Sequence, residues 1–159
     1  MKRYFPDEGD SLKSLFSLLL VVISTVSIAG LVHGRNIELI VRIADALAAS
    51  DVKDRPSGAV KFYFAEEKPP NVAKKLGTYL AAPRTGASGL SDQRACHEAF
   101  LWTLVDLEKR AQRVGANAVV NIVSYYQRKE RSSATEFECH VGNVIVTVWL
   151  KGDFVKLGE

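Results

Sequence analysis

Cysteine is scarce in this 159-residue chain, which holds only two, and they do not form a Cys-x-x-Cys pair. The sequence therefore lacks the paired-cysteine motif of common zinc sites. It also lacks a Gly-x-x-x-x-Gly-Lys-Ser/Thr phosphate loop, so no nucleotide is expected as a ligand. The formal net charge is only +3, which is too small to indicate a nucleic-acid-binding surface.

Charge is also absent from the apolar run at residues 15–32. Basic residues precede this run and small residues close it just before Arg35, which is the pattern of a secretory signal peptide. We expect residues 1–34 to be removed and the protein to work in the periplasm. An uncleaved anchor is the alternative, because the run approaches the roughly 18 residues that can span a membrane. Only in that case is the membrane expected as a partner.

Export determines how Cys96 and Cys139 are interpreted. Disulfides persist in the oxidising periplasm, so a single bridge is the first prediction, ahead of two buried free thiols. Each cysteine precedes a histidine, so a tetrahedral metal site of Cys96, His97, Cys139 and His140 is an alternative. Neighbouring side chains diverge, however, which makes it hard for both members of a dipeptide to reach one metal. A nucleophilic Cys-His pair is the third hypothesis, and a disulfide would abolish it.

The mature chain is predicted to form one α+β domain. Its strongest signal is a long amphipathic helix from Ser91 to Val114, with Ser91 as the N-cap and Gly115 just beyond the end. Residues 35–58 are expected to form an N-terminal arm with a short helix. Residues 59–159 are expected to form a small sheet, β-β-α-β-β along the chain, packed on the long helix.

Four segments have the alternation or the β-branched character of strands. They are residues 60–64, 76–80, 117–126 and 135–151. The third is apolar on both faces, which predicts an interior strand. The fourth shifts phase around Gly142 and Asn143, which predicts a β-bulge or bend. Residues 84–89 have the small, polar composition of a loop.

Two further groups of residues offer binding surfaces. Arg128, Lys129 and Arg131 form a basic cluster in a predicted connector. We interpret this cluster as a solvated turn, with an anionic envelope component or an acidic partner protein as the alternative. Four aromatic residues form the second group, and they are predicted to lie in the core rather than on a binding surface. They are Trp102, Trp149, Tyr125 and Tyr126.

The segment from Gly115 to Ile122 reads Gly-Ala-Asn-Ala-Val-Val-Asn-Ile, between the predicted helix and a strand. It resembles small bacterial domains of the RcsF and YbjQ type, and residues 60–63 are similar to the first core strand of RcsF-like proteins. Five segments together look like an uncharacterised family of exported proteobacterial proteins, often labelled as an excinuclease ATPase subunit. They are residues 43–47, 60–64, 115–126, 133–140 and 151–155.

The resemblance implies an RcsF/YbjQ-like fold and, because YbjQ-like proteins form rings, allows for a homo-oligomer. RcsF-like lipoproteins carry a lipid-modified cysteine and four domain cysteines that this chain lacks, so their signalling role is not carried over. We reject DNA repair and ATP hydrolysis, since the phosphate loop is absent and an exported chain meets neither substrate. The prediction is a non-enzymatic periplasmic binding or interaction domain with no cofactor and an unidentified envelope partner. Metal binding, a label that YbjQ-like domains sometimes carry, is the alternative, and a thiol-dependent enzyme is third.

Overall fold

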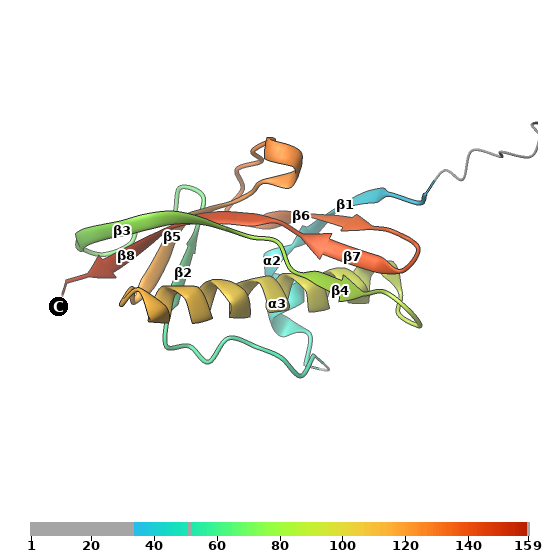
Figure 1. The fold of residues 1–159 in the computed structure, drawn as a ribbon, viewed down its shortest axis with the longest axis horizontal. Helices are drawn as coiled ribbons and strands as arrows, with labels where there is room; N and C mark the ends of the chain where they lie inside the picture. Colours follow the sequence, from blue (N-terminus) through green and yellow to red (C-terminus); the bar gives the residue numbers. More distant parts are fainter. Residues whose placement is uncertain (1–33, 51, 159) are drawn as a thin grey trace, which may run out of the picture. The chain divides into compact units, whose positions relative to one another are not determined.

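In the computed structural model, residues 34–50 and 52–158 form two four-stranded sheets and two α-helices (Figure 1). The class is α+β, as predicted, but the prediction of a single sheet is wrong. Within these described residues, no helix is both long and apolar enough to cross a membrane. The apolar run of the predicted signal peptide lies outside them.

The long helix α3 (Asp92–Arg113) lies where its apolar periodicity predicts it. Ser91 is its N-cap, and the Ser91 Oγ accepts a hydrogen bond from the backbone N–H of Arg94 at 3.4 Å. Val114 is the C-cap, and Gly115 follows with a φ of 75°, a left-handed conformation that glycine adopts without strain. The capping residues therefore fix both ends of the helix.

One sheet has the strand order β1-β6-β7-β4. Its strands are β1 (Ile37–Arg42), β6 (Glu136–Val141), β7 (Ile145–Val148) and β4 (Arg84–Gly86). The extended arm and the short helix expected near the N-terminus are both present, as β1 and the helix α2 (Ile43–Ala48). The prediction of a loop at residues 84–89 is wrong in its first half, because β4 pairs with β7.

The other sheet has the strand order β2-β5-β8-β3. Its strands are β2 (Lys61–Phe64), β5 (Ala118–Ser124), β8 (Leu150–Leu157) and β3 (Val72–Ala81). β5 runs parallel to β2 and antiparallel to β8. All its residues but Asn121 are buried, so the prediction of an interior strand is confirmed.

The segment at residues 135–151 is not one bent strand but a hairpin followed by the start of β8. The backbone N–H of Gly142 donates to the carbonyl of Ile145 at 2.8 Å, and Val141 pairs with Val146. Such a reversal also shifts the phase of the apolar residues, so the phase shift alone does not distinguish a turn from a bulge. After β7 the chain passes Trp149 and enters the other sheet.

A bulge does occur, but it lies in β5 at Asn121. Asn121 has a φ of 52°, and the pairing with β8 shifts register between Val120 and Val123. As a result Val119 and Ile122 both pack into the main core, whereas strict alternation would place them on opposite faces.

Gly152 of β8 packs against this bulge. A Cβ at position 152 would lie 2.6 Å from Cγ1 of Val119 and 3.2 Å from Cγ1 of Ile122, and both side chains are fully buried. We therefore expect Gly152→Ala to lower the free energy of unfolding by about 1–3 kcal/mol through overpacking, measured by urea denaturation. Gly86→Ala is the matched control, because a Cβ there meets nothing within 4 Å. Equal stability of the two variants would contradict the close packing.

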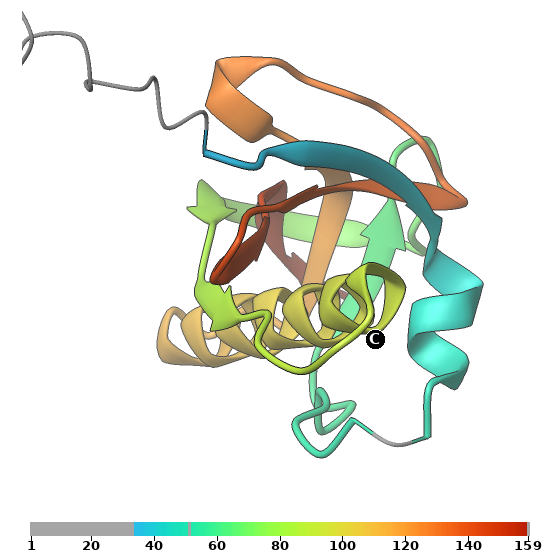
Figure 2. The same cartoon turned by 90° about the vertical axis from the view of Figure 1, so that its right-hand side faces the viewer.

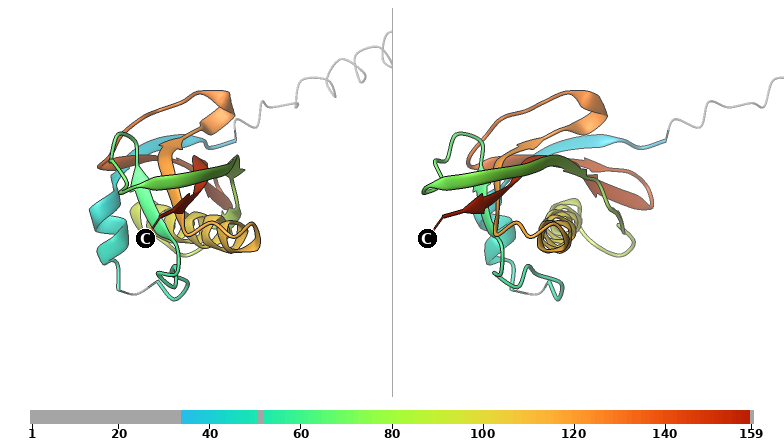
Figure 3. Two further views of the ribbon diagram at one scale, coloured as in Figure 1. Left: turned by 90° about the vertical axis from the view of Figure 1, so that its left-hand side faces the viewer. Right: turned by 60° about the vertical axis from the view of Figure 1, so that its left-hand side comes forward.

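α3 lies on one side of the sheets, and the connector after β5, which contains the 3₁₀ turn η1 (Tyr126–Arg128), lies on the other (Figures 2 and 3). Phe100 of α3 stacks on Phe137 of β6, with ring centroids 4.2 Å apart. It also lies 6.0 Å from the ring of Phe64 in β2. Phe100 therefore contacts both sheets and joins them into one core.

Candidate functional site

Cys96 of α3 and Cys139 of β6 form a disulfide, with their Cα atoms 5.9 Å apart and both side chains fully buried. The first prediction for these residues is confirmed. No cysteine in the described part of the chain is free, so the prediction of two free thiols is wrong. The bond also uses both sulfur atoms, so the Cys2His2 metal set and the Cys-His nucleophile do not exist in this disulfide form of the protein.

The two histidines of the predicted metal set do not share a site. His97 lies on α3, and its Nε2 atom is buried without a hydrogen-bond partner among the described residues. It is not a member of the group of potential metal ligands that gathers around His140.

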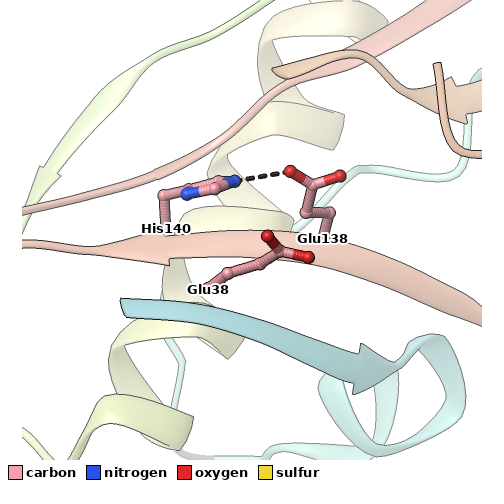
Figure 4. A group of neighbouring side chains, drawn as sticks. All are labelled: Glu38, Glu138 and His140. Carbon is pink, nitrogen blue, oxygen red and sulfur yellow. Dashed lines mark hydrogen bonds and ion pairs between the residues drawn. The ribbon is translucent and has the colours of Figure 1, made fainter. Parts of the chain in front are cut away.

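His140 instead meets two carboxylates on the face of β1 and β6 that points away from α3 (Figure 4). Glu138 precedes it by two residues on β6, so alternation places both side chains on one face and Cys139 on the other. Glu38 lies opposite His140 on the neighbouring strand β1. One ligand atom from each of the three side chains lies within 4.8 Å of the others.

The imidazole of His140 is held from several sides. Its Nε2 lies 2.5 Å from Oε1 of Glu138, and its Nδ1 lies 3.3 Å from Oδ1 of Asn36. The ring of Tyr126 stacks on it, with centroids 3.4 Å apart and an interplanar angle of 14°. Trp149 packs edge-on against Tyr126 at 5.4 Å. These contacts leave His140 only 7% exposed, which fixes the orientation of its ring.

A hollow of about 340 Å³ opens beside this group. In addition to the residues around His140, it is lined by Gln127 and Lys129 from the connector. Gln127 and Arg128 have φ values of 50° and 67°, a region that residues other than glycine seldom adopt. Strained residues of this kind concentrate at ligand-binding and catalytic sites.

The predicted basic cluster is exposed, but its three members have different surroundings. Lys129 lines the hollow beside His140. Arg131 forms an ion pair with Glu136 at 3.7 Å. Arg128 lies in the strained turn. The cluster therefore contributes one lysine to the hollow.

The predicted burial of the aromatic residues is wrong for Trp102, which is 40% exposed on α3. Tyr125, Tyr126 and Trp149 are half-buried; Tyr126 stacks on His140, and Trp149 packs edge-on against Tyr126. Of these aromatic side chains, Tyr126 lines the hollow.

Sequence reasoning missed Asn36, Glu38 and Glu138. The signal that could have found them is a spacing of two within an extended segment, since residues i and i+2 of a strand share a face. Glu138 and His140 have this spacing, and so do Asn36 and Glu38. The hypothesis of a Cys2His2 metal site instead grouped Cys139 with His140, although neighbouring side chains on a strand point in opposite directions.

A second polar hollow, of about 380 Å³, lies on the sheet of β3, β5 and β8. Asp153 accepts hydrogen bonds from Thr78 at 2.5 Å and Asn121 at 3.1 Å, and Lys75 lies 2.9 Å away. Burial raises the pKa of the Asp153 carboxyl, but these three contacts together hold the pKa below its ordinary value. Because the protein itself supplies these partners, we interpret the network as one that ties the three strands together.

No protein-family model matches the chain, and comparisons with curated proteins and with solved structures give no match either. The resemblance to RcsF- and YbjQ-type domains therefore stays a prediction.

Proposed function

We propose that the protein is a non-enzymatic binding domain of the bacterial envelope, which takes a positively charged ligand in the hollow at His140. One observation carries this proposal: Glu38 and Glu138 bring two carboxylates close to a buried imidazole. The described residues that line the hollow include two glutamates and one lysine, Lys129, so carboxylates outnumber ammonium groups there. Such a surface attracts cations and disfavours anions.

The envelope location is supported by the apolar run at residues 15–32 and by the buried Cys96–Cys139 disulfide, a bond that persists in oxidising compartments. Binding is favoured over thiol catalysis because the disulfide engages both cysteines. A relationship to RcsF- and YbjQ-type domains, with self-association, is part of this proposal. It is supported by the segment from Gly115 to Ile122.

The fluorescence of Trp149 can report binding, because Trp149 contacts Tyr126 and Tyr126 contacts His140. The chain has two tryptophans, so Trp102→Phe leaves Trp149 as the sole tryptophan, which is excited selectively over tyrosine. Protein recovered from the periplasm of cells expressing the full W102F chain is titrated with putrescine, spermidine and divalent metal ions. We expect at least one of these cations to change the Trp149 emission.

The same titration of W102F carrying Glu38→Gln and Glu138→Gln is expected to give no change. Asp54→Asn with Glu66→Gln is the matched control, since it removes two carboxylates outside the hollow and should leave the response intact. A W102F protein that responds to none of these cations contradicts the proposed function. Recovery of the protein only from the cytoplasm contradicts the proposed location.

A further inference from the structure

We infer that the ligand of the hollow is a divalent transition-metal ion, with Zn²⁺ as its representative, bound by His140, Glu38 and Glu138. This inference rests on the proposed function and narrows its ligand from a cation to a metal. The donor atoms are one ring nitrogen of His140 and one carboxylate oxygen from each glutamate, all within 4.8 Å of one another, and Glu138 approaches the imidazole at Nε2. A single ion at the centre of such a group can reach all three atoms at about 2.0–2.2 Å after small side-chain adjustments.

The contact between His140 and Glu138 indicates a site for a positive charge. A neutral imidazole with its proton on Nδ1 presents a lone pair at Nε2, and a carboxylate oxygen is also an acceptor. Oε1 of Glu138 lies 2.5 Å from Nε2, a distance at which a proton between the two atoms makes a hydrogen bond. A metal ion bound by both atoms would take the place of that proton.

Asn36 favours the metal-binding tautomer of His140. Its Oδ1 lies 3.3 Å from Nδ1 of the imidazole and can only accept, so this contact favours a proton on Nδ1, which makes the lone pair of Nε2 available to a metal. Histidines that bind metals usually donate their second ring N–H to such an oxygen, which fixes the tautomer and the ring orientation. The stacked ring of Tyr126 adds a second constraint on the same imidazole.

The donor set selects the kind of metal. An imidazole nitrogen disfavours Ca²⁺ and Mg²⁺, which prefer oxygen ligands throughout. No thiolate is available, because both cysteines are in the disulfide, so a Cu⁺ site of sulfur ligands is excluded. One imidazole and two carboxylates give three protein ligands, which leaves a fourth position for water on Zn²⁺.

Charged and titratable groups face the site from three elements: Glu38 on β1, Glu138 and His140 on β6, and Tyr126 and Lys129 on the connector. The Lys129 ammonium repels a bound cation. Replacing it should therefore strengthen binding, whereas replacing a ligand should weaken it.

The test is isothermal titration calorimetry of the untagged protein, purified from the periplasm of cells expressing the full chain, with ZnCl2, and with CaCl2 for comparison. We expect one Zn²⁺ per chain, bound at least about 10-fold more tightly than Ca²⁺. His140→Gln and Glu138→Gln should each weaken Zn²⁺ binding by at least about 10-fold, and so should Asn36→Ala, whose role is to position the imidazole. Lys129→Gln should strengthen it. His97→Gln is the control that should leave the affinity unchanged.

Replacing the buried His140 also removes packing contacts, whereas Glu38 is exposed, so Glu38→Gln keeps the inference falsifiable. Zn²⁺ binding that is no tighter than Ca²⁺ binding, or that is unchanged in Glu38→Gln, overturns the metal assignment. If spermidine or putrescine still changes the Trp149 emission in that case, the proposed function stands and only the metal fails. If no cation changes the emission, both fail.

Discussion

Replacing both members of the Cys96–Cys139 disulfide with alanine is expected to lower the free energy of unfolding by about 4 kcal/mol. The two residues are 43 positions apart in the sequence. Cross-linking a loop of this length removes conformational entropy from the unfolded chain that corresponds to about 4 kcal/mol. Both side chains are fully buried between α3 and β6, so the loss of the two sulfur atoms also leaves a small gap in the packing.

Urea denaturation of the oxidised protein, the reduced protein and the C96A/C139A variant measures this effect. The reduced protein and the variant should have similar midpoints, well below that of the oxidised protein. Their m-values should be higher, because an unfolded chain without the cross-link exposes more surface. A variant whose stability lies within about 1 kcal/mol of the oxidised protein would show that the bond does not constrain the unfolded state as expected.

The helix and the disulfide could be predicted because neither prediction depends on which strands pair. Ser91 and Gly115 define the ends of α3 through interactions within a few residues. The pairing of Cys96 with Cys139 needs no structural knowledge once export is assumed, since the chain has no third cysteine. Both predictions would hold for many different arrangements of the strands.

The division into two sheets could not be predicted, because it depends on which strands pair across long stretches of sequence. β4 has only three residues and exists because β7 lies beside it. The bulge at Asn121 depends on the pairing of β5 with β8, and a positive φ at an asparagine leaves no pattern in the sequence. The turn at Gly142 produces the same shift in apolar phase as a bulge would.

In the candidate site, too, one part could be predicted from the sequence and another part could not. The Glu138–His140 half is visible as a spacing of two in a predicted strand. The other half requires β1 to pair with β6, which brings Asn36 next to His140 across 104 positions of sequence. Tyr126 lies in a third segment, the connector after β5, next to two residues with strained backbone. No spacing rule predicts contacts of this range.

Replacing Phe137 with alanine is the second change expected to have a large effect, a loss of about 3–5 kcal/mol in the free energy of unfolding. Phe137 is 1% exposed, stacks on Phe100 at 4.2 Å and lies opposite Val41 of β1. Truncation to alanine removes most of the ring and leaves a cavity between α3 and β6. Phe137→Leu is the matched control, since it keeps most of the apolar volume and should lose less.

The position of Phe137 relates this loss of stability to the site. Phe137 and Cys139 hold the inner face of β6 against α3, and Glu138 and His140 extend from its outer face. The two inner residues lie close enough to couple, so Phe137→Ala combined with C96A/C139A should give a loss that differs from the sum of the separate losses by more than about 0.5 kcal/mol. Additive losses would show that the ring and the disulfide hold β6 against α3 independently.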